Sequence, residues 1–437
     1  MKKLKWWCMV GLVATGVALS GCGSSDSSSS TSLRVLNATN SHPSIDLQVN
    51  AVVVEPGTAT DAVSAYAGPA SGSNTLQITD AGVTTALATT VPTLSGGNHY
   101  TVVAYEVGST VKTAIVSEDN TTPTSGTAQM RLYNTVVNAG KLDAYVANVA
   151  DCTSTTLSTL SPLTTFTSTT TVTATTLATY SPGTYRVCVT GAGNSADLRM
   201  ELSVTLVSQQ IAFVVMTPTT GGALINGSVL TQQGSNVATR NTNARVRLAS
   251  AVSGNATVSA TATASGVTTT IDSASVAPAF GYYVLVPNAA SQTLSITSVG
   301  SSFSGSVAAP TGLAAGGDYT LLVYGTTAPV ATLLTDDNRP PTDGTSVKLR
   351  LIHGVTGNVG SLTLTANSSL VASGLAAGTA SGYVAVTANT STSAATLKLT
   401  SSVAGTLLTD VNDPLSANTV YTILAGGDVG APQFIIR

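Results

Sequence analysis

Short runs in which apolar and polar residues alternate dominate this chain, and they predict β-strands. Residues 197–202 are an example, because Leu198, Met200 and Leu202 are apolar and the residues between them are polar. Alternation with a period of two places the apolar side chains on one face of a strand. The runs are rich in Val and Thr, which favour strands, and Gly, Asn, Pro and Asp, which break strands, separate them. Long helical patterns are missing, so we expect an all-β fold.

Two phrases of the sequence recur and indicate an internal duplication. The first phrase covers residues 118–127 and is repeated at 336–345, and the second covers residues 96–105 and is repeated at 316–324. Two phrases repeated at nearly the same offset predict repeated local structure. We therefore expect two homologous halves, joined by the polar stretch 232–243.

Each half divides again into two modules, so the chain is expected to hold four. Each module opens with an alternating strand that contains an arginine, and each is expected to contain a later strand led by a tyrosine. The arginines are Arg34, Arg131, Arg247 and Arg350, and the tyrosines are Tyr66, Tyr185, Tyr283 and Tyr383. Several short strands in roughly a hundred residues favour tandem immunoglobulin-like β-sandwich modules. The predicted module bounds are 32–120, 128–231, 243–338 and 346–437.

The N-terminal residues predict export and lipidation. A basic start and a short apolar run lead to Leu19-Ser20-Gly21-Cys22. This stretch resembles the lipobox of bacterial lipoproteins, in which the chain is acylated and cut before the cysteine. We expect a signal peptide over residues 1–21, a lipid on Cys22 and a Ser-rich tether over 22–31. Gly23, and not Asp, follows the cysteine, which resembles the default outer-membrane destination.

Composition argues against two classes of function. Only 8% of the residues are charged and the formal net charge is −3, so no basic stripe exists to contact nucleic acid. His42, His99 and His353 lie far apart in sequence, and neither Gly-x-Ser-x-Gly nor Cys-x-x-Cys occurs. Residues 191–196 match a dinucleotide fingerprint in form, but a strand pattern follows them, so we expect a β-hairpin there. We expect no catalytic activity and no cofactor.

The module starts resemble the domain-of-unknown-function family 4397. That family opens with an Arg-Val-Val-His or Arg-Val-Val-Asn strand, a short turn with Pro, and Ala-Val-Asp-Val. Residues 34–47 follow this pattern with Asn37 and Asp46, and residues 131–143 keep the same spacing. The fourth module has His353 at the His position, but Ser361 or Thr363 replaces the Asp. The resemblance implies secreted or envelope-attached β-sandwich domains and no agreed activity.

Asp46 and Asp143 each follow an opening arginine by a dozen residues. An aspartate at this spacing is expected to pair with the arginine or to cap the turn between the first two strands. The alternative is a ligand-binding role. The third module has Ser250 and Ser259 instead of the Asn and the Asp, and this departure weakens the ligand alternative.

Cys152 and Cys188 are expected to form a disulfide in the second module. They are the cysteines that remain once Cys8 leaves with the signal peptide and Cys22 is lipidated. An exported chain meets an oxidising environment, in which paired cysteines form disulfides. A metal or redox pair is the alternative, but Cys-x-x-Cys spacing is lacking.

Two oxygen-rich clusters at the predicted module joins are weak candidates for calcium. They contain Asp119 with Asn120, and Asp337 with Asn338. Calcium prefers hard oxygen ligands of this kind. The alternative is ordinary turn chemistry before a proline.

These observations favour a non-catalytic envelope lipoprotein with a structural or adhesive role. Its expected partners are the membrane, through the lipid anchor, and an envelope polymer or protein. The alternative is a small-ligand or glycan-binding module. That alternative depends on Tyr66, Tyr283 and Tyr383 as stacking platforms, because both tryptophans, Trp6 and Trp7, lie in the signal peptide.

Overall fold

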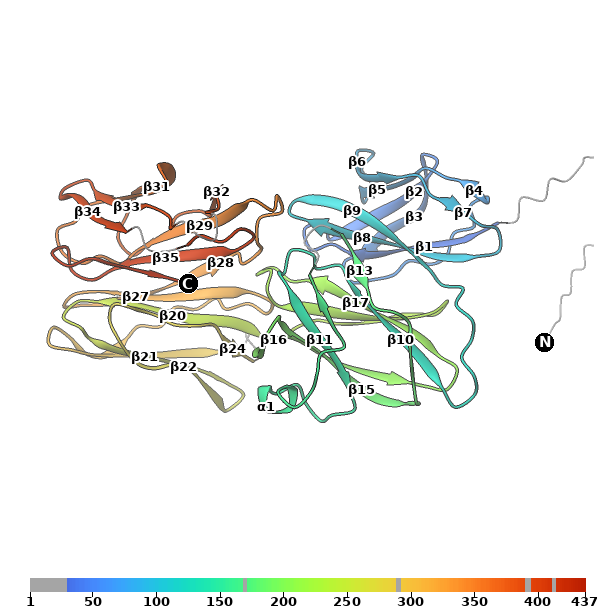
Figure 1. The fold of residues 1–437 in the computed structure, drawn as a ribbon, viewed down its shortest axis with the longest axis horizontal. Coiled ribbons are helices and arrows are strands. Elements are labelled where there is room, and N and C mark those ends of the chain that lie inside the picture. The colour runs from blue at the N-terminus through green and yellow to red at the C-terminus, as the bar shows by residue number, and fades with distance from the viewer. Residues whose placement is uncertain (1–29, 168–170, 288–291, 390–393, 411–413) are drawn as a thin grey trace, which may run out of the picture.

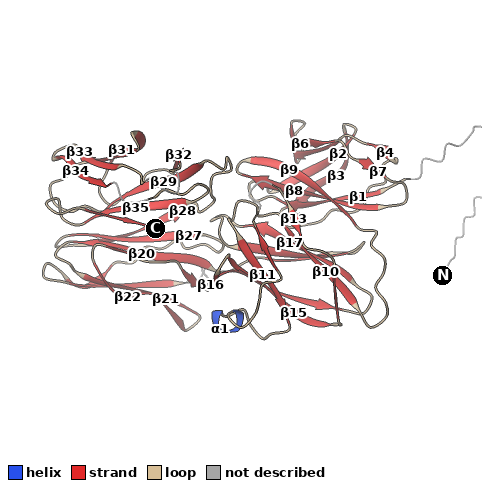
Figure 2. Cartoon of the chain, in the orientation of Figure 1, coloured by secondary structure: helices blue, strands red, loops and turns tan. Residues whose placement is uncertain are grey.

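The computed structural model describes residues 30–167, 171–287, 292–389, 394–410 and 414–437. These residues form strands β1 to β36 and one short helix, as the alternation predicted (Figure 2). Within the described ranges no helix is long and apolar enough to cross a membrane. The expected signal peptide, Cys22 and most of the Ser-rich tether lie outside the described residues.

The first module has two facing sheets. Their strand orders are β1-β8-β9 and β3-β2-β5-β6, and β4 pairs with β7 separately. The bounds are β1 (Ser32–Ala38), β2 (Ser44–Val49), β3 (Val52–Ala59), β4 (Gly72–Ser73), β5 (Leu76–Asp80), β6 (Ala86–Thr90), β7 (Thr93–Leu94), β8 (His99–Val107) and β9 (Thr110–Ser117).

The second module repeats this arrangement and adds strands at one edge. The bounds are β10 (Ala128–Asn134), β11 (Leu142–Ala147), α1 (Ser154–Leu157), β12 (Thr164–Phe166), β13 (Thr173–Ala174), β14 (Ala178–Tyr180), β15 (Gly183–Gly191), β16 (Asn194–Leu206), β17 (Ile211–Pro218), β18 (Ile225–Thr231) and β19 (Asn236–Thr239). One sheet has the order β13-β10-β17-β18-β19, with β14 also on β10, and the other is β12-β11-β15-β16. The β15–β16 hairpin confirms the hairpin expected over 191–196.

The second module ends later than the sequence suggested. Strand β19 pairs with β18 from Gly227↔Thr239 to Leu230↔Asn236. Part of the polar stretch 232–243 is therefore a strand of the module, and not a linker. This edge strand is short and largely exposed, and backbone hydrogen bonds hold it with little apolar burial.

The third module follows the same plan. The bounds are β20 (Ala244–Val252), β21 (Thr257–Ala264), β22 (Val267–Val276), β23 (Ala279–Phe280), β24 (Val284–Val286), β25 (Thr293–Val299), β26 (Ser304–Val307), β27 (Asp318–Gly325) and β28 (Val330–Asp336). The sheets are β23-β20-β27-β28, with β24 also on β20, and β22-β21-β25-β26.

The fourth module closes the chain with two four-stranded sheets. The bounds are β29 (Ser346–His353), β30 (Leu362–Ala366), β31 (Ser369–Leu375), β32 (Val384–Thr387), β33 (Leu397–Ser401), β34 (Gly405–Asp410), β35 (Val420–Gly426) and β36 (Gln433–Ile436). The sheet orders are β32-β29-β35-β36 and β31-β30-β33-β34.

The four modules share one topology. In each, the opening strand pairs in parallel with a late strand: β1 with β8, β10 with β17, β20 with β27, and β29 with β35. The strand predicted at Tyr185 is present, but it does not correspond to the strands that follow Tyr283 and Tyr383, and Tyr66 lies outside the strands. Tyr185 lies in β15 of the other sheet, and the edge strand that corresponds to β24 and β32 is β14, which contains Tyr180. Strand β14 has only three residues, too few for alternation to identify it.

The opening strands are buried on both faces, and this joins the modules in pairs. Leu33 and Val35 pack in the core of the first module, whereas Leu36 on the opposite face packs against Phe213 of the second module. The third and fourth modules meet in the same way around Leu322 and other residues. Each half is therefore four sheets deep, with one module above the other (Figure 1).

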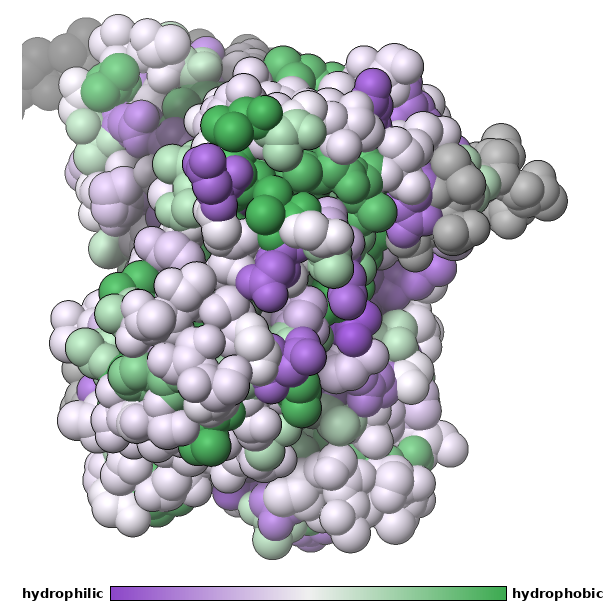
Figure 3. Space-filling view, turned by 90° about the vertical axis from the view of Figure 1, so that its left-hand side faces the viewer, coloured by the Kyte–Doolittle hydropathy of each residue, from purple (hydrophilic) through white to green (hydrophobic). Residues whose placement is uncertain are grey.

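Surface polarity follows from the composition. In the view of the end formed by the third and fourth modules, most of the surface is pale, which means neither strongly polar nor strongly apolar (Figure 3). Apolar side chains gather in the upper part of this view, over the fourth module. A chain with 8% charged residues presents such a surface because Ser, Thr, Ala and Gly cover it.

Candidate functional site

Asp46 and Asp143 cap hairpins in the structure and do not pair with the opening arginines. Asp46 accepts hydrogen bonds from the backbone N–H groups of Gly57 (2.7 Å) and Gly82 (2.9 Å), and Asp143 accepts one from Gly193 (2.7 Å). Gly82 and Gly193 both have a φ of +75°, which favours glycine. The capping interpretation holds, but the capped turns are β5–β6 and β15–β16, and not the turn between the first two strands.

The fourth module keeps part of this arrangement, in which a polar side chain accepts a hydrogen bond from the backbone N–H of a glycine. Thr363 occupies the position of the aspartate, and its hydroxyl accepts a hydrogen bond from the N–H of Gly374 at 3.4 Å. Gly374 has a φ of +63°, close to the +66° of Gly57. A hydroxyl therefore replaces the carboxylate beside the equivalent strand irregularity, in β3 of the first module and β31 of the fourth, which is a structural role.

The three histidines remain apart and serve separate contacts. His42 lies 2.7 Å from Asp80, and His99 lies 3.0 Å from Asp119. His353 is fully buried at the end of β29, where Nε2 is 3.1 Å from the carbonyl of Gly360. Burial lowers the pKa of His353, so the ring favours its neutral form.

Cys152 and Cys188 form the predicted disulfide, with a Cα–Cα distance of 5.7 Å. Cys188 lies in β15, and Cys152 lies two residues before α1. Both cysteines pack with Tyr145 and Leu157 in a small buried cluster. The bond therefore fastens the segment around α1 to the sheet.

The residues singled out for calcium are held by protein groups. The carboxylate of Asp119 accepts from the N–H of His99 at 2.6 Å, and Asn120 donates to Gln232 at 2.9 Å. Asn338 donates to Asp318 at 2.6 Å. Across the part of the chain that the structure describes, no group of three or more His, Cys, Asp or Glu could hold a metal ion.

Asp337, the remaining calcium candidate, lies between two cations. It is 2.7 Å from Arg339 and 2.8 Å from Lys348. Burial opposes ionisation of Asp337, but the bonds to Arg339 and Lys348 outweigh it and lower its pKa to about 2. This carboxylate acts as an anchor for the connector between the third and fourth modules.

The first join between modules contains a buried ion pair that sequence reasoning missed. Arg34 contacts Glu118 through two hydrogen bonds of 2.7 and 3.0 Å, and both side chains are buried. The same guanidinium reaches the second module, where it donates to the backbone carbonyls of Gly234 and Thr231. The central carbon of the Arg34 guanidinium, Cζ, lies 4.5 Å from the centre of the Tyr66 ring.

The second join contains the corresponding cluster, with two arginines on one acid. Arg350 and Arg247 contact the two oxygens of the fully buried Asp336. Each arginine also donates to a threonine of the other module: Arg247 to Thr422 at 2.9 Å, and Arg350 to Thr320 at 3.3 Å. The reciprocal contacts lock the two sheets face to face.

The tyrosines proposed as stacking platforms belong to these clusters. The guanidinium of Arg247 lies 4.4 Å from the ring of Tyr283, and that of Arg350 lies 4.7 Å from the ring of Tyr383. Their rings are partly covered by cations inside the molecule. A more exposed aromatic side chain is Tyr282, which is 76% exposed and had no distinguishing signal in the sequence.

The two halves meet at a third cluster of charges. Asp197 and Arg199 of the second module are 2.6 Å apart, and Arg245 of the third module lies 3.6 Å from Asp318. Asp318 is fully buried, and burial raises its pKa to about 6, because its cationic neighbours compensate only in part. The cluster brings together residues that are more than a hundred positions apart in sequence.

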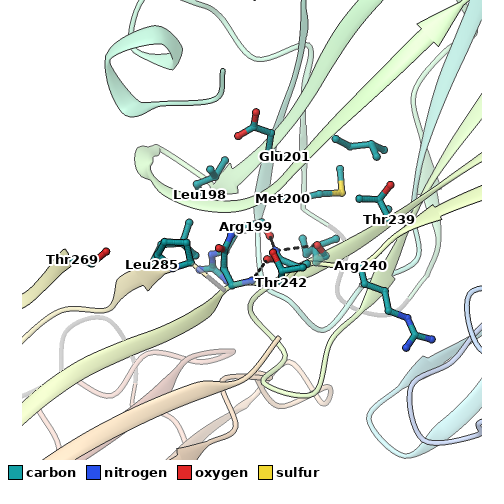
Figure 4. Close-up of a pocket in the computed structure, with 15 residues that line it drawn as sticks. Leu198, Arg199, Met200, Glu201, Thr239, Arg240, Thr242, Thr269 and Leu285 are labelled. Carbon is teal, nitrogen blue, oxygen red and sulfur yellow. Dashed lines mark hydrogen bonds between the residues drawn. The ribbon is translucent and has the colours of Figure 1, made fainter. Parts of the chain in front are cut away.

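Two clefts flank the segment that joins the halves. One has a volume of about 610 Å³ and is lined by Met200, Glu201 and Leu285 among other residues (Figure 4). The other has a volume of about 600 Å³ and lies between Pro43, Thr219 and the same joining segment, 240–242. Clefts of this size suit small ligands, and a lining that combines apolar side chains with a few polar groups is typical of binding sites.

Comparison with known proteins supports the family resemblance for the N-terminal part of the chain. Residues 31–145 match the family described as Domain of unknown function (DUF4397). This stretch covers the first module, the first strand of the second module and most of β11. No curated protein matches the sequence.

One solved structure with a distant similarity is the "Product complex of a multi-modular glycogen-degrading pneumococcal virulence factor SpuA". The two chains share 8% identity, with a TM-score of 0.14, and the match covers 63% of this chain and 37% of that one. A TM-score this low carries no argument about fold or function.

Proposed function

We propose that this chain, whose residues 31–145 match a domain of unknown function, is a non-catalytic lipoprotein of the cell envelope with a structural or adhesive role. The lipid on Cys22 would hold it in the outer membrane. Its four modules would then present their loops and clefts to an envelope polymer or protein.

The observation that carries this proposal is the way in which the modules are locked together. Buried arginine clusters join the modules of each half, at Glu118 in the first and at Asp336 in the second. Buried charges of this kind hold a unique arrangement, because a shift of one module would leave them unpaired. A stiff assembly of small β-sandwiches suits a spacer or scaffold. The buried charged clusters of this chain lie between modules, where they stiffen the assembly.

The predicted N-terminus fits such a role. A Ser-rich tether of about ten residues spans roughly 17–19 Å as a flexible coil, enough to lift the modules from the membrane. Each buried methylene of a lipid chain contributes about 0.8 kcal/mol, so several acyl chains hold a protein firmly.

The test is membrane fractionation after expression in a bacterium that processes lipoproteins. We expect the wild type in the outer-membrane fraction and Cys22→Ser in the soluble fraction. Ser24→Ala is the matched control, because it changes a residue near the predicted lipidation site and leaves Cys22 and the Cys152–Cys188 disulfide in place. Retention of Cys22→Ser in the membrane would refute the anchor.

A glycan-binding function is the second candidate, and Tyr282 is the observation that favours it. This exposed ring borders an open cleft of about 680 Å³ that also contains Asp272 and Arg437. Aromatic faces beside planar charged groups are common in sugar recognition. A glycan array with wild type and Tyr282→Ala tests this candidate, and Tyr180→Phe, a ring in the core of the second module, is the control.

A further inference from the structure

The outer edge of β36 is unpaired, whereas the equivalent edge in the first half is covered by a strand. Strands β18 and β36 hold the same place, because each pairs with the late strand that runs parallel to the opening strand of its module. In the first half, β19 pairs with the outer edge of β18. Within the described ranges, no strand pairs with the outer edge of β36. An edge of this kind presents backbone groups that can pair with a further strand.

The pairing registers show which residues of the two edges correspond. In the fourth module, Arg350 lies beside Thr422, which exchanges two backbone hydrogen bonds with Arg437, at 2.8 and 3.1 Å. The same steps in the second module lead from Arg131 to Leu230. Leu230 of β18 and Arg437 after β36 are therefore equivalent.

The backbone groups of Phe434 and Ile436 point to the free edge. Successive residues of a strand direct their backbone groups to opposite sides, and those of Arg437 point inward, to β35. The equivalents of Phe434 and Ile436 in the first half, Gly227 and Val229, pair with β19. The carbonyl of Ile436 accepts a hydrogen bond from the Arg437 side chain at 3.0 Å, but the N–H groups of Phe434 and Ile436 have no partner in the described part of the chain.

The open cleft of about 680 Å³ that Tyr282 borders lies beside this edge. Ile435 and Arg437 line one side of the cleft, and residues 270–275 and 278–282 of the third module line the other. The cleft therefore runs between the free edge and the facing module.

The wall of the cleft matches the surface that β19 contacts in the first half. Bridges to the two opening strands make Val63 the counterpart of Phe280, and therefore Asp61 the counterpart of Pro278. Asn236 of β19 donates a hydrogen bond to the carbonyl of Asp61 at 2.9 Å, and Pro278 lines the cleft. The cleft is therefore the place that a strand occupies in the first half.

We propose that this edge and cleft bind an extended segment of a partner protein, which adds to β36 as an antiparallel strand in the way that β19 adds to β18. In strand addition, main-chain hydrogen bonds give affinity and contacts with alternate side chains give specificity. The proposal rests on the adhesive role proposed above and names the partner as a polypeptide. It does not involve the lipid anchor, which membrane fractionation tests separately.

The partner segment is expected to carry an apolar side chain where β19 has Ala238. Ala238 lies opposite Ser228 in the first half, and Ile435 takes the place of Ser228 in the second. Opposite residues on one face of a sheet contact each other. Ile435 lines the cleft together with Tyr282, which is 76% exposed, so an apolar side chain at this position would cover apolar surface.

The test is calorimetric titration of the full mature chain with a peptide of the sequence 233–242 that carries Ala238→Leu. We expect saturable binding, and weaker binding of the peptide that keeps Ala238. N-methylation of the peptide at Val237 and Thr239, which pair with the outward-facing residues of β18 in the first half, should weaken binding roughly tenfold or more, because two hydrogen bonds are lost. N-methylation at Asn236 and Ala238 is the matched control, because those N–H groups point away from the edge.

Hydrogen exchange and a cleft variant locate the bound peptide. Binding at the edge should slow the exchange of the amides of Phe434 and Ile436 and leave that of β18 unchanged. Ser273→Trp places a large ring in the wall of the cleft and should abolish binding. Ser203→Trp, at an exposed position of β16 outside the cleft, is the control.

Three outcomes would overturn the proposal. The first is no saturable binding of the Ala238→Leu peptide up to about 1 mM. The second is equal binding of the two N-methylated peptides, which would mean that backbone pairing does not hold the peptide. The third is binding of a glycan at Tyr282 without binding of the peptide, which would assign the cleft to the glycan-binding candidate.

Discussion

Arg34 and Glu118 are 84 residues apart in sequence, yet their side chains form a buried two-point ion pair with contacts of 2.7 and 3.0 Å. Arg34 opens the first module, and Glu118 directly follows its last strand, β9. The backbone N–H of Gln233, in the second module, donates to the same carboxylate at 2.6 Å. The pair therefore closes one module and docks the next.

Replacing Glu118 with Gln should strongly destabilise the protein. The change leaves Arg34 buried without its counter-charge, and breaking one side of a buried ion pair typically costs about 3–5 kcal/mol. Denaturant unfolding of the mature chain measures this loss. Asp119→Asn is the matched control, because that carboxylate is partly exposed and should change the unfolding free energy by less than about 1 kcal/mol.

A double replacement tests whether the pair stabilises the fold or only fixes its arrangement. Arg34→Met with Glu118→Leu removes both charges, and apolar replacements of buried ion pairs are often neutral or stabilising. We expect this variant to recover most of the stability that Glu118→Gln loses. Equal loss in the two variants would contradict the interpretation that an unpaired charge is the cause.

The strands and the duplication were predictable because their signals are local. Alternation marks a strand wherever one face is buried, and repeated phrases mark repeated turns. The disulfide followed from counting cysteines in an exported chain. None of these inferences needed to know which modules touch.

The inter-module clusters could not be predicted because their partners are distant in sequence. Spacing offered Asp46 either as a partner of Arg34 or as a turn cap, but spacing along a chain carries no information on packing between sheets. The sequence does contain one usable signal for these clusters. Each copy of the repeated phrase begins with an acidic residue, Glu118 in the first copy and Asp336 in the second. The sequence pattern did not predict strand β19 for another reason: backbone hydrogen bonds, rather than buried apolar side chains, hold this strand in place.

The stability of the protein should fall as pH rises from about 4 to about 7 through the contribution of Asp318. Burial raises the pKa of this carboxyl to about 6 in the folded state, above its ordinary value of 3.8. The folded state then binds a proton that the unfolded state has released, so the stabilisation is complete below pH 4 and is lost as pH passes 6. A pKa shift of this size limits the contribution of Asp318 to the free energy of unfolding to at most about 3 kcal/mol.

Asp318→Asn checks this prediction. The amide keeps an oxygen that can accept from Asn338 and removes the titration. Unfolding free energies of both proteins at pH 4.5 and 7.5 give the difference, because every other group titrates in both. The variant should gain stability relative to the wild type at the higher pH, and a pH-independent difference would contradict the prediction.

Removal of the Cys152–Cys188 bond should destabilise the second module. The cysteines are 36 positions apart, and closing a loop of that length contributes about 3–4 kcal/mol in the chain-entropy model. We expect the double variant Cys152→Ala, Cys188→Ala and the reduced wild type to show the same drop in melting temperature. Alkylation of both thiols in the exported protein without prior reduction would show that the bond does not form.

The last prediction concerns where the first half can be cut. A fragment that ends at residue 235 lacks β19, whereas one that ends at residue 241 keeps it together with Arg240. Asn236 donates to the carbonyl of Asp61 at 2.9 Å, and Arg240 lies 3.1 Å from its carboxylate, so this segment also fastens the second module to the first.

We therefore expect the fragment 30–241 to fold and the fragment 30–235 to be less stable, by several kilocalories per mole. The shorter fragment loses the β18–β19 pairing, which leaves β18 as an exposed edge strand. It also leaves the buried carboxylate of Asp61 without Arg240. Denaturant unfolding and limited proteolysis of the two fragments measure the difference. The longer fragment with Arg240→Gln separates the ion pair from the strand: a small loss there would assign the effect to β19. Equal stability of 30–241 and 30–235 would mean that the polar stretch is a linker after all.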